Sequence, residues 1–254
     1  MVLAIDIGNT HILLGCFEDR RILFTELLST NKTNTELEYA SLIKHALEFN
    51  GFTADSVDGA ILSSVVPQVT PAVQKAVERL TSVEPLVVGP GVKTGLKIKI
   101  DNPAQLGSDL VVSAIAGIKE YGVPQINIYM GTATAFSLID KDKNFVGTSI
   151  GAGMGIEAEA LSSKTSQLPN IAFETPRKVI GTNTIDSMKS GLVYQNAALV
   201  DGMIDRIEEE YGEPCVLTAT GRYAALIAPL CRHKIILDTD LILKGLIEVY
   251  YKNS

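Results

Sequence analysis

The sequence predicts an α/β fold with two similar domains, residues 1–121 and 122–254, each built from a sheet covered by helices. A chain of 254 residues is long enough for two domains, since one domain usually holds roughly 100–200 residues. Both halves open with the same succession of an apolar strand, a polar turn that contains glycine, and two further strands. Segments with the helical spacing of apolar residues alternate with the strands that follow.

The first half begins with apolar strands expected at residues 2–5, 12–17 and 22–28, with a polar turn at residues 6–10 between the first two. A helix follows, because Thr35 and Glu38 have the spacing of a capping box. Its buried face is expected to consist of Leu37, Ala40, Ile43 and Leu47, and Asn50-Gly51 is expected to end the helix. The later elements are a strand at residues 59–62, a helix at about 70–80, and a helix that begins at Pro103 behind the cap Asn102 and ends at Gly122.

The second half repeats the strand pattern and then adds helices. Its strands are expected at residues 126–128, 135–139 and 145–150, and residues 131–134 form the polar turn. A long helix is expected at about residues 184–211. The remaining elements are a strand at 215–217, a helix at 223–230, a strand at 234–237 and a terminal helix.

Charge and cysteine content disfavour several classes of protein. The formal net charge is −7 and no run of five like charges occurs, so no surface for nucleic acid or an anionic membrane is indicated. Cys16, Cys215 and Cys231 are odd in number and lack a CxxC pair, which argues against a disulfide framework and a structural zinc site. The apolar run at the N-terminus breaks after five residues, so neither a signal peptide nor a membrane span is expected. We therefore expect a cytoplasmic protein.

The strongest motif is DIGNT at residues 6–10, which lies between two apolar strands. Asp6 is suited to hold Mg²⁺, through water, because carboxylates are preferred ligands of this ion. Gly8 lets the backbone approach a phosphate, and Asn9 and Thr10 can donate hydrogen bonds to it. Taken alone, the same spacing also fits an ordinary β-turn.

Two further segments could contact a nucleotide. The turn at residues 131–134, with Gly131 and Thr132, offers backbone donors and hydroxyls at the matching place in the second half. Gly221 follows a strand and precedes a helix, which suits an adenosine, although an ordinary helix start has the same pattern. Gly151, Gly153 and Gly155 do not have the GxGxxG spacing, so we do not favour a dinucleotide turn there.

These motifs together resemble the type III pantothenate kinase family, which belongs to a superfamily with actin, sugar kinases and heat-shock chaperone ATPases. The resemblance covers nearly the whole chain and rests on DIGNT at 6–10, LSSVVP at 62–67, the DNPxxxGxD pattern at 101–109, GTAT at 131–134, SQLP at 166–169, GxNTxxSxxSG at 181–191, VDGMI at 200–204, TG at 220–221 and DTDLILKGL at 238–246. It implies two ribonuclease-H-like, actin-like ATPase domains with the nucleotide in an interdomain cleft. It also implies a homodimer that uses ATP and Mg²⁺ to phosphorylate pantothenate to 4′-phosphopantothenate, the first step of coenzyme A biosynthesis.

The resemblance also implies roles for single residues. Asp109 matches the base that accepts the hydroxyl proton of pantothenate, and a carboxylate suits that work. Its neighbours Gly107, Ser108 and Leu110 match the substrate-binding segment. The nucleotide-contacting threonine matches Thr132, and the threonine that reaches pantothenate across the dimer interface matches Thr184, which also fits a helix cap. Helical spacing agrees with the role of Asp109, because Gln105, Asp109 and Ser113 lie one turn apart on a polar face opposite Leu106, Leu110 and Ala114. A merely solvated helix face is the alternative.

Several positions depart from the family pattern. Leu110 stands where the family has arginine, and leucine supplies neither the charge nor the forked donors. Tyr129 stands where an aspartate binds a monovalent cation, K⁺ or NH₄⁺, in the family. Ser113 and Ile100 replace an asparagine and a substrate-side tyrosine. Two explanations stay open: an active kinase with an altered pocket and reduced potassium dependence, or a divergent subunit of a heterodimer that needs a related, more typical partner.

Overall fold

The computed structural model describes residues 1–254 and holds two sheets, each in a compact unit of its own. Unit 1 contains Met1–Leu96, Asn102–Ala116 and Leu241–Ser254, and unit 2 contains Lys97–Asp101 and Gly117–Asp240. Both units are discontinuous in sequence, whereas the expected boundary after residue 121 is a single cut. The C-terminal helix returns to unit 1, a long-range contact that local patterns do not reveal.

The sheet of unit 1 is mixed, with the strand order β3-β2-β1-β4-β5. Strand β1 pairs antiparallel with β2 and parallel with β4, and all of its residues are buried. The strands are β1 (Val2–Ile7), β2 (His11–Glu18), β3 (Arg21–Ser29), β4 (Gly59–Ser64) and β5 (Leu86–Val87). Because β1 continues to Ile7, Asp6 lies inside the strand, and the predicted turn at residues 6–10 is shortened to its last three residues.

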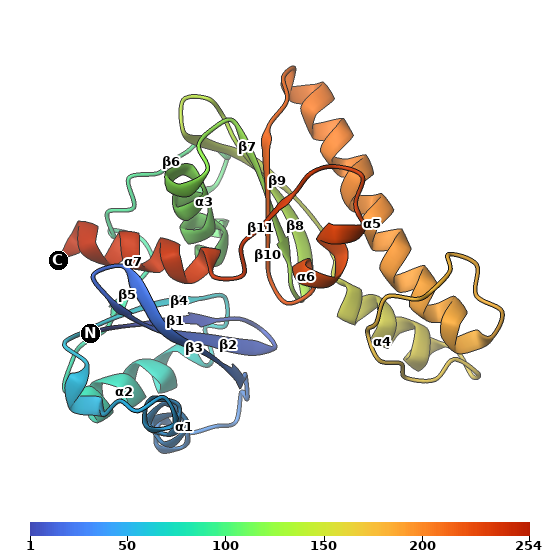
Figure 1. The fold of residues 1–254 in the computed structure, drawn as a ribbon. Helices are drawn as coiled ribbons and strands as arrows, with labels where there is room; N and C mark the ends of the chain where they lie inside the picture. Colours follow the sequence, from blue (N-terminus) through green and yellow to red (C-terminus); the bar gives the residue numbers. More distant parts are fainter. The chain divides into compact units, whose positions relative to one another are not determined.

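Helices α1 (Glu36–Phe49) and α2 (Thr70–Thr81) cover one face of this sheet, and α7 (Leu241–Asn253) covers the other (Figure 1). The predicted capping box of α1 is present: the Thr35 side chain accepts a hydrogen bond from the Glu38 backbone N–H, and the Glu38 side chain accepts one from the Thr35 backbone N–H. The prediction for Leu37 is wrong, because this side chain is 61% exposed while the rest of the expected face is buried. It lies at the edge of the apolar stripe, next to the helix start.

The core of unit 1 lies between the sheet and its helices and is made mainly of aliphatic side chains, with Phe24, Tyr39 and Cys16 among them. Its largest fully buried members include Leu3, Ile5, Ile7, Ile12, Leu14, Tyr39, Ile43, Leu47 and Leu62. Burial of such side chains contributes about 1.5–3 kcal/mol each and fixes the register of β1 against its neighbours. The end of β1, where Asp6 lies, is therefore held rigidly.

Helix α3 (Ser108–Glu120) begins later than predicted. Pro103 behind Asn102 opens only a 3₁₀ turn, Pro103–Gln105, and the α-helix starts two residues after Leu106. The expected polar face is also wrong, because Ser113 is buried together with Leu110 and Ala114, and Gln105 is outside the helix. Asp109 therefore lies in the first turn of a largely buried helix.

The sheet of unit 2 is also mixed, with the strand order β11-β10-β7-β8-β9-β6. Its strands are β6 (Lys97–Ile98), β7 (Gln125–Met130), β8 (Ala133–Ile139), β9 (Asn144–Ala152), β10 (Val216–Thr220) and β11 (Ile236–Leu237). Strand β6 pairs only with the start of β9, so β9 is exposed along most of its length after Phe145.

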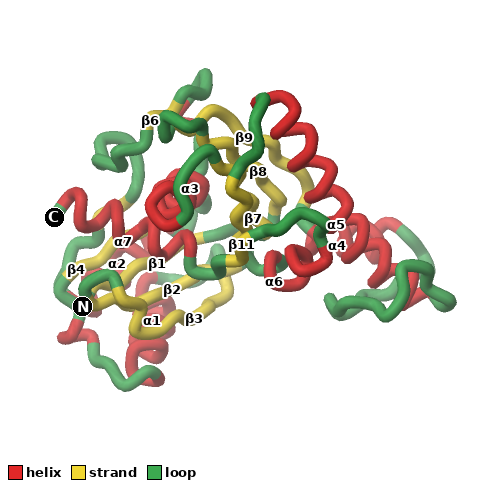
Figure 2. Tube along the Cα trace, turned by 45° about the horizontal axis from the view of Figure 1, so that its top comes forward, coloured by secondary structure: helices red, strands yellow, loops and turns green.

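Helices α4 (Met154–Lys164) and α5 (Thr184–Tyr211) lie side by side, and α5 is the longest helix in the tube of Figure 2. The bounds of α5 agree with those expected from the sequence. The helix expected at 223–230 is instead a short α6 (Ala224–Ile227) followed by the 3₁₀ turn Ala228–Leu230, because Pro229 has no N–H to continue the α-helical ladder.

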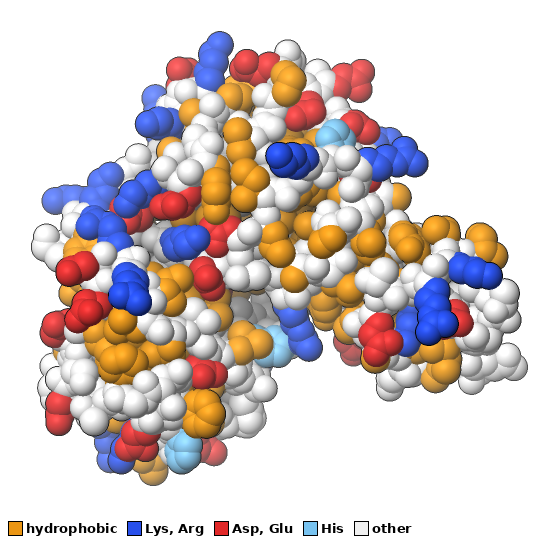
Figure 3. All heavy atoms as spheres, viewed as in Figure 1, with side chains coloured by type: hydrophobic (Ala, Val, Ile, Leu, Met, Phe, Trp, Pro, Cys, Tyr) orange, Lys and Arg blue, Asp and Glu red, His pale blue; other side chains and the backbone are white.

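Two mixed sheets with helices on them confirm the predicted α/β fold class. No helix has both the length and the apolar composition that crossing a membrane requires. Basic and acidic side chains are interspersed on the face drawn in Figure 3. This distribution agrees with the modest net charge of −7.

Candidate functional site

Asp6 is a buried acid near the end of β1, where only 5% of the residue is exposed. The parallel register of β1 and β4 places Asp6 beside Ser63. The Ser63 hydroxyl donates a hydrogen bond of 2.5 Å to Asp6 Oδ1. Because the carboxyl ends of these parallel strands share one sheet edge, the carboxylate is presented where ligands of open α/β sheets bind.

Asp109 reaches the same sheet edge through the start of α3. The backbone N–H of Ser64, the last residue of β4, donates to Ser108 Oγ at 3.0 Å. The Ser108 hydroxyl in turn donates to the Ser64 carbonyl at 3.1 Å. This reciprocal pair fastens the first turn of α3 to the strand beside Asp6, and so it fixes the position of Asp109.

The pKa values of Asp6 and Asp109 are both raised. Burial, and secondarily the negative charge of Asp109, raise the pKa of Asp6 from 3.8 to about 7, although the Ser63 hydrogen bond lowers it. Burial also raises the pKa of Asp109, against the opposing effect of hydrogen bonds from the backbone N–H groups of Leu110 and of Asp109 itself. Two carboxyls with raised pKa values at one sheet edge are typical of a catalytic or metal-binding site.

The turn after β1 is held by its own backbone. The Gly8 N–H donates to the His11 carbonyl at 3.0 Å, and the Gly8 carbonyl accepts from Thr30 Oγ1 at 2.6 Å. The Gly8 N–H is therefore occupied, and Gly8 shapes the turn. Asn9 and Thr10 are exposed, which leaves the tip of the turn open to a ligand.

The neighbours of Asp109 have structural partners. A Cβ atom on Gly107 would clash with Asp109 Oδ1, so only glycine leaves room for the carboxylate in this position. Leu110 is 7% exposed and its side chain belongs to the core. The hydroxyl of Ser108 is engaged with Ser64, as described above. These residues therefore orient Asp109.

The second predicted turn, in unit 2, joins β7 to β8. Its backbone is closed by the Gly131 N–H, which donates to the Ala133 carbonyl at 3.0 Å. Gly221, directly after β10, packs against it with a φ of +96°, and a Cβ on Gly221 would lie 2.6 Å from the Met130 carbonyl oxygen. Gly221 thus lies against the end of β7, next to the turn with Gly131 and Thr132, and the contact of these residues with a nucleotide stays a prediction.

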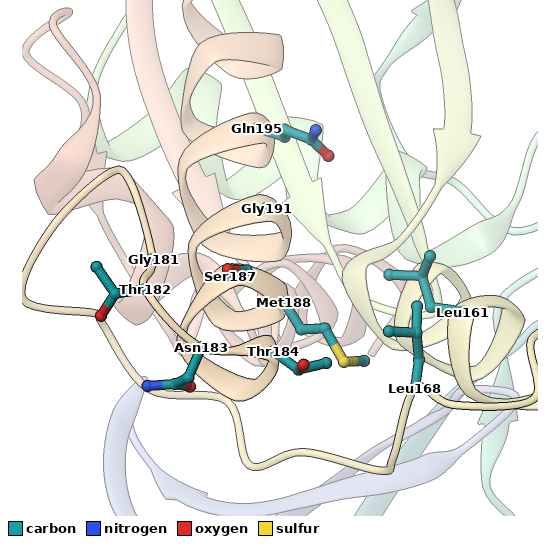
Figure 4. Close-up of a pocket in the computed structure, with 10 residues that line it drawn as sticks. All are labelled: Leu161, Leu168, Gly181, Thr182, Asn183, Thr184, Ser187, Met188, Gly191 and Gln195. Carbon is teal, nitrogen blue, oxygen red and sulfur yellow. The ribbon is translucent and has the colours of Figure 1, made fainter.

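Thr184 lies elsewhere in unit 2, at the start of α5. It lines a pocket of about 660 Å³ between the ends of α4 and α5 (Figure 4). The remaining lining residues are Leu161, Leu168, Gly181, Thr182, Asn183, Ser187, Met188, Gly191 and Gln195. The N-cap is Asn183, whose side chain accepts from the Asp186 N–H, so Thr184 is not the cap. The pocket is lined by hydroxyl and amide side chains and by the apolar side chains of Leu161, Leu168 and Met188. This combination suits a small polar organic molecule.

Sequence reasoning missed Ser63 and Ser64 as site residues. Their only local signal is the pair of serines at the end of an apolar strand, within the segment LSSVVP. Their partners Asp6 and Ser108 are 57 and 44 residues away in sequence, so the contacts follow from the tertiary fold. Asn183 and Ser187 lie in the GxNTxxSxxSG segment but received no role of their own, because the loop before α5 completes the pocket that they line together with Gln195.

Sequence comparisons find close relatives. The family model described as type III pantothenate kinase matches residues 2–206. A type III pantothenate kinase of Bacillus cytotoxicus is 40% identical over 254 residues, which is all of this chain and 97% of that protein.

Solved structures with the same fold are more distant in sequence. Component A of (R)-2-hydroxyglutaryl-CoA dehydratase from Acidaminococcus fermentans aligns with a TM-score of 0.57 and 13% identity, over 99% of this chain and 96% of that one. The activator of 2-hydroxyisocaproyl-CoA dehydratase from Clostridium difficile, solved with bound ADPNP, aligns with a TM-score of 0.54 and 9% identity, over 99% and 93% of the two chains. At this identity the likeness establishes the fold alone.

Proposed function

Because the chain belongs to the type III pantothenate kinase family, we propose that it transfers the γ-phosphate of ATP to pantothenate, forming 4′-phosphopantothenate in the first step of coenzyme A biosynthesis. The observation that carries this proposal is the pair of carboxyls, buried Asp6 and half-buried Asp109, at one sheet edge of unit 1. Asp6 is suited to bind a metal ion, and Asp109 is suited to accept a proton. Phosphoryl transfer uses acidic side chains for both purposes.

Asp6 is the residue that fits Mg²⁺. Its carboxyl is buried beside a second negative charge, and a divalent cation would offset both charges. The Ser63 hydroxyl orients one carboxylate oxygen and leaves the other available. When bound with ATP, Mg²⁺ neutralises the charge that develops on the phosphates. In the free protein, a pKa of about 7 keeps part of the Asp6 population neutral.

Asp109 acts as the general base. As the substrate hydroxyl oxygen bonds to the γ-phosphorus, its proton passes to the Asp109 carboxylate, and the bond from the γ-phosphorus to the bridging oxygen breaks so that ADP leaves with the electron pair. The raised pKa of Asp109 brings its basicity closer to the working pH. Gly107, Ser108 and Leu110 serve as positioning residues that hold this carboxylate.

Phosphate contacts are assigned to the two polar turns. In unit 1, the exposed Asn9 and Thr10 supply side-chain and backbone donors, and Gly8 sets the shape of the turn. In unit 2, Thr132 and the backbone at Gly131 supply donors, and Gly221 keeps the segment after β10 close to that turn. Backbone N–H groups in such turns are well suited to phosphate oxygens.

Thr184 contacts pantothenate, and the active form is a homodimer. The exposed part of β9 and the neighbouring helices carry apolar side chains, including Ile150, Ile156 and Ile185, that are 44–64% exposed. An open strand edge with exposed isoleucines favours burial against a second copy. The pocket beside Thr184 lies at the same helices. The cytoplasmic location stays a prediction.

The test is pantothenate-dependent ADP release by the purified chain with ATP and Mg²⁺, coupled to detection of 4′-phosphopantothenate. Asp109→Asn removes the base, and Asp55→Asn, an exposed acid of the same unit, is the matched control. We expect product from the wild-type protein and from Asp55→Asn. ADP release that does not respond to pantothenate would contradict the proposal.

The second candidate function is a divergent subunit that requires a related partner. Leu110 favours it, because this buried side chain provides no cationic group where the family pattern has arginine. Under this alternative the chain alone binds ATP but forms no product at any protein concentration, and adding a typical family member restores turnover. Full activity of the isolated chain would eliminate this alternative.

A further inference from the structure

Tyr129 is the residue where the family resemblance implies a ligand for a monovalent cation. It is the penultimate residue of β7, and the register places it beside Ala135 of β8 and Thr220 of β10. It directly precedes Met130 and the turn that we assign to phosphate. Its side chain is half-buried.

The Tyr129 ring packs against the turn itself. Its Cε1, Cζ and Oη atoms lie 2.6–2.7 Å from the position that a Cβ atom on Gly131 would occupy. Side chains essentially never approach a Cβ so closely, so the turn accommodates the ring only because residue 131 is glycine. The phenol therefore fills the space that adjoins the Gly131 backbone.

The chemistry of this segment does not fit a monovalent cation. Residues 125–139, which form β7, the turn and β8, contain no Asp or Glu. A phenol is neutral and offers one oxygen at the end of a rigid ring, whereas hard cations prefer carboxylate, carbonyl or water oxygens with room to surround the ion. The space next to Gly131 is occupied by the ring.

We infer that Tyr129 supports the phosphate turn in place of a monovalent cation, so that ATP binding and phosphate transfer by this chain do not require K⁺ or NH₄⁺. This inference rests on the proposed function. Tyr129 is a positioning residue: its ring packs against Gly131 and so supports the turn to which the nucleotide contact is assigned.

The first test compares ATP binding in two salts. Calorimetry with ATP and Mg²⁺ is performed in KCl and in tetramethylammonium chloride at matched ionic strength, and turnover is measured in the same buffers. We expect the affinity and the rate to agree within about twofold. A gain of more than about tenfold in potassium, in either quantity, would overturn the inference.

The second test separates the ring from the hydroxyl. Tyr129→Phe keeps the ring and should leave the KM for ATP nearly unchanged, whereas Tyr129→Ala should raise it roughly tenfold with a smaller effect on kcat. Tyr211→Ala, which removes a tyrosine at the end of α5, is the control and should leave the KM for ATP unchanged. An unchanged KM in Tyr129→Ala would overturn the role of the ring.

Failure of the proposed function can be told apart from failure of this inference. Equal ATP affinity in both salts, without any 4′-phosphopantothenate, would contradict the proposed function and still support the role of Tyr129. ATP binding only in potassium would overturn the inference and leave the proposed function intact. No ATP binding in either salt would contradict both.

Discussion

At the scale of single residues, the proposed role of Asp109 as general base is the most direct to test. Asp109→Asn keeps the size of the side chain and removes its basicity, so kcat should fall roughly 10²–10⁴-fold, the usual contribution of a general base. ATP binding should persist, because the donors that we propose for the phosphates lie in the polar turns and not at Asp109. Steady-state kinetics together with the thermal shift caused by ATP check this. Unchanged kcat in Asp109→Asn, with Asp55→Asn as reference, would contradict the assignment.

Asp6 should make the ligand-free protein less stable as pH rises. Its folded-state pKa is about 7 and its ordinary value is 3.8, so between about pH 4 and pH 7 the folded state binds more protons than the unfolded state. The contribution of Asp6 to the free energy of unfolding is fully present below the ordinary pKa of 3.8 and is lost as pH increases through about 7. Asp6→Asn should therefore raise the Tm at pH 8 without nucleotide. A lower Tm for Asp6→Asn at pH 8 would contradict the buried, raised-pKa carboxyl.

At the scale of elements, the junction between β10 and α6 depends on Gly221. Gly221→Ala combines a φ of +96° with a clash at the Met130 backbone. Gly212→Ala is a matched control, because Gly212 has a φ of +94° but no atom near the position of its Cβ. We expect Gly212→Ala to cost roughly 1–2 kcal/mol in unfolding free energy, and Gly221→Ala to cost more and weaken ATP binding. Equal effects of the two variants would contradict this close packing.

Elements with local signals were predictable from sequence, and those set by distant contacts were not. The capping box at Thr35 and the uninterrupted helical pattern of α5 gave correct helices, because each depends on residues within a few turns. The start of α3 was wrong, because Ser108 is fixed by Ser64 in β4. The motif around Asp6 is recognisable in the sequence. The burial of Asp6 and its hydrogen bond with Ser63 result from the parallel pairing of β1 with β4, which the sequence does not reveal.

At the scale of the whole molecule, the proposed homodimer makes a testable prediction. Ile185 is 48% exposed beside Thr184, so Ile185→Asp should place a charge in the apolar contact, shift the protein to monomers and reduce turnover. Leu37→Asp, at a site 61% exposed in unit 1, is the control and should leave the dimer intact. Light scattering coupled to size exclusion measures the mass. A monomeric wild-type protein with full activity would contradict the dimer.

The central claim is that this chain alone phosphorylates pantothenate, and the most direct measurement follows the label of γ-³²P-ATP. Purified protein with Mg²⁺ and pantothenate, in buffers with and without potassium, should move the label to 4′-phosphopantothenate at a rate that Asp109→Asn greatly lowers. Label that in both buffers stays in ATP, or is released only as inorganic phosphate, would contradict the account.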